Sequence, residues 1–144
     1  MGEALLLAAE AERNGEVPVG AIVVMDGEIR GRGFNSPVRL SDPTAHAEML
    51  AIREAARVAG NYRLENSTLY ATLEPCVMCA GALVQARIGR LVFGARDLRF
   101  GGVRSKFRLA DSDVLNHRLE ITEGVRAAQC LEMLKKFFAD RREQ

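Results

Sequence analysis

Hydrophobic and polar positions along the chain form short blocks that predict helices and strands in turn. Residues 3–14 place leucines and alanines on one side of a short helix. Residues 17–25 are almost continuously apolar and predict a strand. They lead into Asp26-Gly27, a dipeptide that favours a two-residue turn, and residues 28–34 are expected to form the second strand. The first part of the chain is therefore expected to be a helix followed by a β-hairpin.

The segment NSPVRLSDPT, residues 35–44, contains two prolines among polar residues and predicts a loop. Asp42 or Thr44 can cap the next helix, and the proline between them suits its first turn. We expect that helix to run to about Ala59 and to end at Gly60-Asn61.

Strands and helices continue to alternate through the rest of the chain. STLYATL, residues 67–73, contains β-branched and aromatic residues and predicts a buried strand. A helix is expected to open at Pro75 and to close at Gly89. The elements expected after it are a strand at 90–95, a mostly irregular stretch at 97–116, a strand at 118–124 and a helix at 126–142. This alternation favours a three-layer α/β/α fold with the sheet in the middle.

Length and composition are those of an ordinary soluble domain. The chain has 144 residues, of which 48% are hydrophobic and 27% charged, and we expect a single domain over residues 1–144. No apolar run approaches the roughly 18 residues that a membrane span needs. The short run ALLLAA near the start lacks the basic leader of a signal peptide, so a cytoplasmic protein without membrane attachment is expected.

The net charge of +1 conceals a basic segment at residues 87–108. This segment holds seven arginines and lysines against a single acid, Asp97, so it alone carries a charge of +6. A solvated face with local ion pairs and a surface for phosphate groups are both consistent with such a segment.

Two of the three cysteines have the spacing of a metal-binding pair. Cys76 and Cys79 are three residues apart in the first turn of the predicted helix, so their sulfurs share one face. The unpaired N–H groups and the positive end of the helix dipole favour thiolates there, and thiolates are the form that binds metal. The third cysteine, Cys130, lies in an apolar helical stretch and is expected to be a core residue.

A buried pair or a thioredoxin-type redox motif is the alternative interpretation of an isolated C-x-x-C. The redox motif usually follows the first strand of a βαβ unit, whereas this one begins a central helix and is preceded by a candidate third ligand, His46. Two thiolates and one imidazole form a soft donor set that suits zinc. The other histidine, His117, is expected to be a surface or hydrogen-bonded residue.

His46 and Glu48 are two residues apart, a spacing that points side chains to nearly opposite sides of a helix. Both can still serve one site if the helix points its N-terminus at the metal. Three protein ligands with no evident fourth are typical of a catalytic zinc, whose open position holds a water that ionises near neutral pH. Glu48 is not needed as a ligand, so we expect a general acid/base; the alternative is an acid that only stabilises the helix N-terminus.

H-x-E followed by P-C-x-x-C resembles the signature of the zinc-dependent cytidine/deoxycytidylate deaminase-like family. Within that family, the stretches TLEPCVMCAGA, RIGRLVFGARD and NHRLEITEG are most similar to the tRNA-specific adenosine deaminases. The resemblance covers nearly the whole chain. It implies a cytidine-deaminase-like fold, with a five-stranded mixed sheet between helices, and a homodimer with one Zn2+ per subunit.

The same resemblance implies residue roles and a reaction. His46, Cys76 and Cys79 are expected to bind zinc and Glu48 to shuttle protons, while hydroxide attacks C6 of adenine and ammonia leaves. The substrate is expected to be the wobble adenosine of a tRNA anticodon stem-loop, which leaves its stack and becomes inosine.

Substrate contacts are also implied. Asn35 matches an asparagine that holds the nucleoside, Asp97 lies where the family contacts the RNA backbone, and Val19 and Leu73 are expected in the pocket wall. The residues alone leave other interpretations open, namely a turn residue for Asn35, strand core for Val19 and an arginine partner for Asp97. By the same reasoning Phe137-Phe138 is more often helix core than a base-stacking platform, although the family contacts RNA with that end of the chain.

Two other functions stay open. One is a deaminase of a free base or nucleoside, of guanine or cytosine type, and the other is a zinc-stabilised RNA-binding module without catalysis. The loop after GARD departs from the family, because Val103 and Arg104 stand where small residues are usual. The added charge suits phosphate contact.

Overall fold

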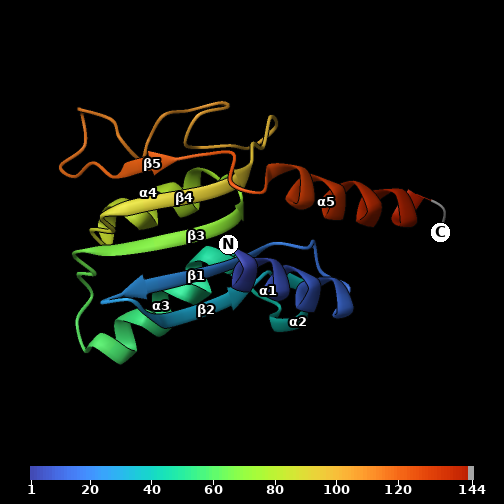
Figure 1. Ribbon diagram of the computed structural model, residues 1–144, viewed down its shortest axis with the longest axis horizontal. Helices are drawn as coiled ribbons and strands as arrows, with labels where there is room; N and C mark the ends of the chain where they lie inside the picture. Colours follow the sequence, from blue (N-terminus) through green and yellow to red (C-terminus); the bar gives the residue numbers. More distant parts are fainter. Residues whose placement is uncertain (143–144) are drawn as a thin grey trace.

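A five-stranded sheet runs through the middle of the molecule, with helices on both of its faces (Figure 1). The computed structural model describes residues 1–142. The elements are α1 (Gly2–Arg13), β1 (Gly20–Met25), β2 (Glu28–Phe34), α2 (Pro37–Leu40), α3 (Ala47–Ala59), β3 (Ser67–Leu73), α4 (Val77–Gln85), β4 (Arg90–Ala95), β5 (Glu120–Thr122) and α5 (Ala127–Arg142). Among residues 1–142, no helix has the length and apolar character that a membrane crossing requires.

The sheet is mixed, with the strand order β2-β1-β3-β4-β5. β1 pairs antiparallel with both β2 and β3, whereas β3, β4 and β5 run parallel to one another. The central strands contribute Leu69, Leu91 and Phe93 to the core, all fully buried. Strands covered on both faces are expected to be continuously apolar, which is why STLYATL and RLVFGA were recognisable in the sequence. The five-stranded mixed sheet implied by the resemblance is confirmed.

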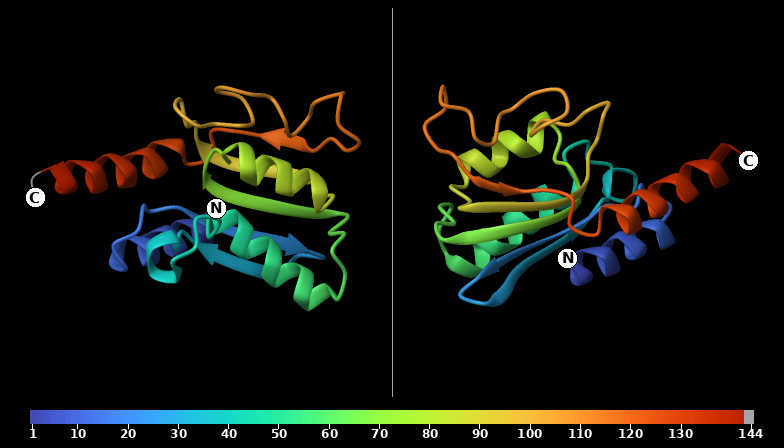
Figure 2. Two further views of the ribbon diagram at one scale, coloured as in Figure 1. Left: turned by 180° about the vertical axis from the view of Figure 1, so that it is seen from behind. Right: turned by 45° about the horizontal axis from the view of Figure 1, so that its top comes forward.

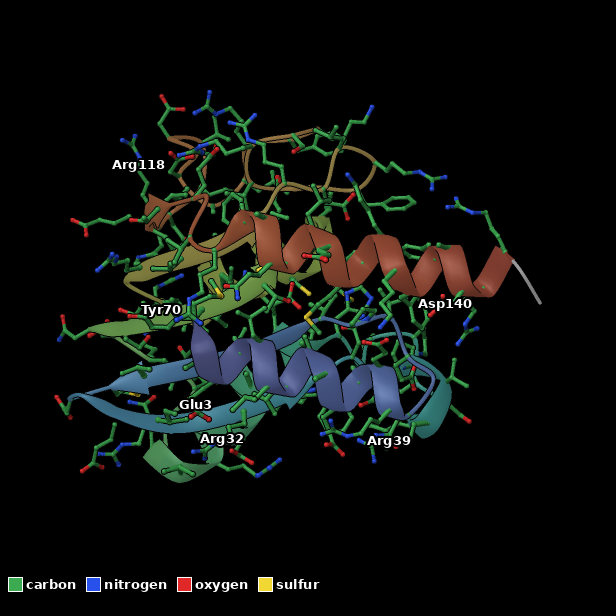
Figure 3. The ribbon with its side chains drawn as sticks, turned by 45° about the vertical axis from the view of Figure 1, so that its right-hand side comes forward. Glu3, Arg32, Arg39, Tyr70, Arg118 and Asp140 are labelled. Atoms are coloured by element: carbon green, nitrogen blue, oxygen red, sulfur yellow. The ribbon has the colours of Figure 1, made fainter. Side chains whose placement is uncertain are left out.

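Two glycines show how closely helices approach the two faces of the sheet. A Cβ added at Gly20 would lie 2.0 Å from the Ala4 carbonyl oxygen of α1, and one added at Gly31 would lie 2.1 Å from the Ala51 carbonyl oxygen of α3. Gly31 pairs with Val23, three residues from Gly20, so the two glycines face opposite sides. Figures 2 and 3 show α4 beside α3 on one face and α5 beside α1 on the other. The expected three-layer α/β/α arrangement is confirmed.

The hairpin is confirmed, but its first strand begins later than predicted. Asp26 and Gly27 both have positive φ, 53° and 74°, as a two-residue turn between twisted strands requires. β1 starts at Gly20 and not at Val17. Pro18 has no N–H to donate, and the Val19 N–H turns back to the Val17 carbonyl 2.8 Å away, so this stretch is a local turn outside the ladder.

The prediction of an uninterrupted loop at residues 35–44 was wrong, because α2 lies within it. Pro37 occupies the first turn of α2, where the N–H that proline lacks would have no acceptor within the helix. The next two N–H groups, of Val38 and Arg39, donate to the buried carboxylate of Glu16 at 3.3 and 2.7 Å. A cap supplied from more than 20 positions away has no local signature in the sequence.

The prediction that Asp42 or Thr44 caps α3 was also wrong. Asp42 instead accepts hydrogen bonds from the backbone N–H and hydroxyl of Thr44, at 2.8 and 2.7 Å. His46 occupies the N-cap position, and the first helical N–H, of Ala47, donates to Asn35 Oδ1 at 2.9 Å. The predicted end of the helix is confirmed, since Gly60 is left-handed with φ 65°.

Two later boundaries also differ from the predictions. α4 ends at Gln85 and not at Gly89, because Arg87 is left-handed with φ 60° and its guanidinium donates to the Val84 carbonyl at 2.8 Å. β5 is confined to Glu120–Thr122, because the preceding Leu119 N–H donates to Ala110 in the long loop. Cys130 is 2% exposed, which confirms it as a core residue.

Gly31→Ala is expected to lower the free energy of unfolding by about 1–3 kcal/mol or more, because the new methyl group forces α3 away from β2. Gly81→Ala is the control, since Gly81 lies in α4 with no atom within 4 Å of an added Cβ. That change is expected to stabilise the helix by up to about 1 kcal/mol. Urea unfolding of both variants measures the difference, and equal stabilities would contradict this packing.

Candidate metal and catalytic site

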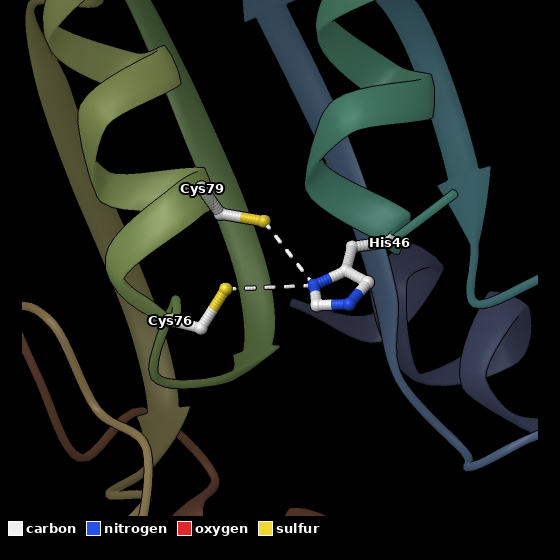
Figure 4. A group of neighbouring side chains, drawn as sticks. All are labelled: His46, Cys76 and Cys79. Carbon is white, nitrogen blue, oxygen red and sulfur yellow. Dashed lines mark hydrogen bonds between the residues drawn. The ribbon is translucent and has the colours of Figure 1, made fainter. Parts of the chain in front are cut away.

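The N-termini of α3 and α4 meet at three potential metal ligands (Figure 4). His46 is the N-cap residue of α3, Cys76 is the N-cap residue of α4, and Cys79 lies in the first turn of α4. The His46 Nδ1 atom lies 3.5 Å from the Sγ atom of each cysteine. A tetrahedral zinc ion, with bonds of about 2.0–2.1 Å to nitrogen and about 2.3 Å to sulfur, separates such atoms by about 3.5 Å. The three side chains therefore fit zinc.

The three side chains are close enough to change one another's acidity. A hydrogen bond from Cys79 lowers the pKa of Cys76 to about 4, while the same bond raises the pKa of Cys79. A hydrogen bond with Cys76 raises the pKa of His46. Cys76 is therefore the more acidic of the two thiols, and a bound divalent ion would neutralise the thiolates that hold it. Within residues 1–142, no other group of three such ligands comes together.

Glu48 is a buried carboxyl beside this group. It lies in the first turn of α3, is 4% exposed, and lines the same cavity as His46. Burial raises the pKa of Glu48 to about 7, against the opposing effect of the His46 charge. Because both residues sit at the tip of the helix and not along its flank, their spacing of two does not separate them. A carboxyl group with this pKa can take up and release a proton near neutral pH.

A cavity of about 1240 Å3 opens above the two helix tips. Its lining includes, of the residues predicted from the sequence, His46, Glu48, Cys76, Asn35, Val19, Leu73 and Asp97. Cys79 is fully buried behind them, with its sulfur directed at His46. The structure therefore brings the predicted site residues together around one space, although they come from five separate stretches of the chain.

Two of these residues also have structural contacts. The side-chain oxygen of Asn35 accepts the Ala47 N–H, so its amide NH2 is the group that remains for the cavity. Asp97 accepts the N–H groups of Arg99 and Phe100, each at 3.1 Å, so one of its oxygens shapes the loop itself. Val19 is 3% exposed and belongs to the core as well as to the cavity wall.

The far wall of the cavity comes from α5, which the sequence interpretation missed. The residues concerned are Leu131, Leu134, Lys135 and Phe138. Their spacing of i, i+3, i+4 and i+7 marks one face of a helix and could have identified them as a group. The two phenylalanines have different environments. Phe137 is 8% exposed and packs in the core as predicted, whereas Phe138 is 47% exposed and faces the cavity.

The basic residues of segment 87–108 also have different environments, some at the cavity and some in ion pairs. Arg99 lines the cavity, and so does Arg96, which also pairs with Glu123 at 2.9 Å. Arg104 makes two hydrogen bonds to Asp111, both of 3.0 Å. Local ion pairs and a basic cavity rim are therefore both present. His117 donates its Nε2–H to the Ile88 carbonyl oxygen 2.7 Å away, which confirms it as a hydrogen-bonded residue.

A zinc ligand set of one histidine and two cysteines next to a non-ligand glutamate defines a class of hydrolases that remove amino groups from nucleobases. Residues 1–95 match the cytidine and deoxycytidylate deaminase zinc-binding region, and the chain belongs to this family of zinc-dependent hydrolases. The matched residues include the whole His46, Cys76 and Cys79 group.

Individual relatives narrow the comparison within the family. The tRNA-specific adenosine deaminase of Haemophilus influenzae is 53% identical over 145 residues, covering 100% of this chain and 84% of that protein. A structure solved in work on A-to-I editing by tRNA:A34 deaminases, at the wobble position of transfer RNA, is 41% identical. It superposes with a TM-score of 0.88 over 91% of this chain and 95% of that one. Guanine deaminase from Bacillus subtilis is 42% identical, with a TM-score of 0.63 over 66% of this chain and 61% of that one.

Cys76→Ser is expected to reduce bound zinc from about one ion per chain to a small fraction, because a hydroxyl group replaces a soft thiolate ligand. Elemental analysis after gel filtration measures the metal directly. Cys130→Ser is the matched control, since it removes a cysteine that lies outside the cluster. Retention of zinc by Cys76→Ser, or its loss from Cys130→Ser alone, would contradict the assignment.

Proposed function

We propose that this protein hydrolyses the wobble adenosine of tRNA anticodons to inosine. In this proposal His46, Cys76 and Cys79 hold one zinc ion and Glu48 carries the protons, all within one domain at residues 1–144. The observation that carries the proposal is the meeting of two helix tips at a zinc-type donor set, beside a buried carboxyl group whose pKa is about 7. The tRNA-specific adenosine deaminase at 53% identity supports adenosine as the substrate.

Glu48 performs the proton transfers that the reaction needs. Zinc, when bound, supplies a water that ionises near neutral pH. Glu48 takes the proton released as oxygen attacks C6 of adenine, and delivers a proton to N1. It then takes the proton of the new hydroxyl group on C6 and passes it to the amino group, which leaves as ammonia while the C6 carbonyl of inosine forms. Its burial keeps solvent from exchanging the proton during these steps.

The other cavity residues hold the base in place. Val19 and Leu73 present apolar surface to the faces of the purine, which suits a base extruded from its stack. The Asn35 amide NH2 group donates to an acceptor on the nucleoside, because its carbonyl oxygen is already engaged with Ala47. Asp97 contacts the RNA next to the target through the oxygen that does not cap the loop.

The size and charge of the cavity favour RNA over a free base. Its volume of about 1240 Å3 exceeds the roughly 300–1,000 Å3 of ordinary small-molecule sites. Arg96, Arg99 and Lys135 lie along it, and a free base carries no phosphate for them to bind. Phe138 adds an exposed aromatic surface of the kind on which unpaired bases stack. A free-base deaminase of guanine or cytosine type is the second candidate, favoured by the partial match to guanine deaminase.

We also propose a homodimer that acts in the cytoplasm, where tRNA is the partner. Several large apolar side chains in the long loop before β5 are exposed, among them Phe107 at 57% and Val114 at 85%. Exposed large apolar side chains of this kind are suited to a subunit interface. Sedimentation equilibrium of the zinc-loaded protein distinguishes a dimer from a monomer.

Zinc-loaded protein is expected to convert an anticodon stem-loop with adenosine at the wobble position to inosine. Glu48→Gln is expected to lower the rate by at least about 10²-fold, since an amide cannot transfer the protons. Chromatography of the digested RNA measures inosine, while zinc content and RNA affinity, both expected to be unchanged, serve as controls. Activity near that of the wild type would refute the proton-transfer role. Intact RNA binding with no inosine from the wild-type protein would favour the binding module.

Binding of the stem-loop is expected to weaken steeply with salt, with a slope of about −0.7 in log–log form per phosphate neutralised. Arg99→Gln is expected to make that slope less steep by about 0.7, the contribution of one phosphate contact. The control is Arg57→Gln, an exposed arginine in the last turn of α3, at the opposite end of that helix from His46. Affinity that does not change with salt, together with turnover of free guanine, would establish the second candidate instead.

A further inference from the structure

We propose that Glu74 is a positioning residue that holds the loop of residues 97–105 as a rigid, substrate-facing wall of the cavity. Neither the zinc site nor the proton transfers use this carboxylate. The inference rests on the proposed function for the identity of the substrate, but the organisation of the loop by Glu74 follows from contacts alone.

Glu74 directly follows β3, is 2% exposed, and accepts hydrogen bonds from both ends of the loop. Its Oε1 atom accepts the Asp97 N–H at 3.1 Å and the Ser105 hydroxyl. Its Oε2 atom accepts the N–H groups of Val103, Arg104 and Ser105 at 3.1, 2.7 and 2.9 Å. One carboxylate thus gathers both ends of a nine-residue loop that has no helix or strand of its own.

The loop lies directly against this carboxylate and the start of α4. A Cβ added at Gly101 would be 2.4 Å from the Glu74 carboxylate, so only glycine fits at this crossing. The Gly102 N–H donates to the Pro75 carbonyl at 2.8 Å, and Gly101 forms a bridge with Cys76. The wall is therefore attached to the same turn that carries a zinc ligand.

The position of the loop determines what the cavity presents to RNA. Asp97, fixed through its N–H by Glu74, accepts the N–H groups of Arg99 and Phe100 with its own carboxylate. This arrangement directs Leu98, Arg99 and Phe100 outward, where they are exposed and line the cavity. Glu74 thereby sets the place of a cation and an aromatic ring that contact the substrate.

Arg104 fastens the same loop from its outer side. Its backbone N–H donates to Glu74, while its guanidinium makes two hydrogen bonds to Asp111 and lies 3.9 Å from Glu123. The preceding residue, Val103, is fully buried. These are the positions at which the sequence departs from the small residues usual in the family. The departure therefore produces a second anchor for the wall, and the charge of Arg104 is used within the protein.

Glu74 is a positioning residue and not a second proton carrier. Both of its oxygens are occupied by donors, five in all, and charge-assisted hydrogen bonds of this kind are among the strongest in proteins. A carboxylate committed in this way has no free lone pair aimed at a substrate. Its effect on the reaction passes through the loop.

Glu74→Gln tests the proposal, because the amide places an NH2 group against backbone donors and leaves at least one buried N–H without an acceptor. In the zinc-loaded protein, KM for the stem-loop is expected to rise about tenfold while kcat stays within about threefold. Zinc content is expected to remain at about one ion per chain. Amide hydrogen exchange is expected to accelerate at Val103, Arg104 and Ser105, with α4 unchanged.

Glu54→Gln is the control, since Glu54 also accepts a backbone N–H, that of Arg32, on the far side of the molecule from the loop. It is expected to change neither kinetics nor exchange in the loop. A fall in kcat at constant KM, or loss of zinc, would overturn the proposal in favour of a role in the metal site. Unchanged exchange at residues 103–105 would overturn it regardless of activity.

Hydrogen exchange also separates this proposal from the proposed function. If the wild type forms no inosine, the function is wrong, yet faster loop exchange in Glu74→Gln still supports the organisation of the wall. Should Glu74→Gln fail to fold, Ser105→Ala is the second variant, because it removes only the hydroxyl donor to Glu74 and is less disruptive to folding. It is expected to raise KM by about twofold to threefold and to accelerate exchange at the same amides, and no change in either would refute the proposal.

Discussion

The arrangement on which this site depends is the convergence of two helix N-termini on one face of the sheet. The first N–H groups of α3 and α4, with the positive ends of the two dipoles, stabilise negative charge where the helices meet. The two helix N-termini thus stabilise thiolates and a carboxylate in a buried place, where desolvation disfavours negative charge. The same geometry lets His46 and Glu48 act together, since side chains at a helix tip are not divided between its flanks.

Three buried glutamates show how environment assigns different roles to one residue type. Glu16 accepts two backbone N–H groups and holds α2, and Glu74 accepts five donors and holds the loop after β4. Glu48 is surrounded differently, and burial raises its pKa to about 7. Burial acts against the charge of Glu74, but its hydrogen bonds lower the pKa below the usual value, whereas at Glu48 desolvation prevails and the group can exchange a proton.

Prediction from the sequence succeeded where the signal was local and failed where a distant group decided the outcome. The Asp26-Gly27 turn and the apolar strands followed from conformational preference and burial, and both are confirmed. The start of α3 was wrong because Asn35 supplies the cap, and α2 was missed because Glu16 does. Neither contact has a characteristic spacing in the sequence.

By itself, the sequence determined the donor chemistry: two cysteines three apart, one histidine and a nearby glutamate already specify a soft divalent metal and a proton carrier. It also determined the alternation of strands and helices, because burial on both faces of a sheet requires apolar runs. Only the tertiary structure decided that Phe138 faces the cavity while Phe137 is buried, that Arg104 is paired, and that Glu74 holds the wall. Those outcomes depend on which segments meet after folding, and pairwise contacts between distant segments are not encoded in local preference.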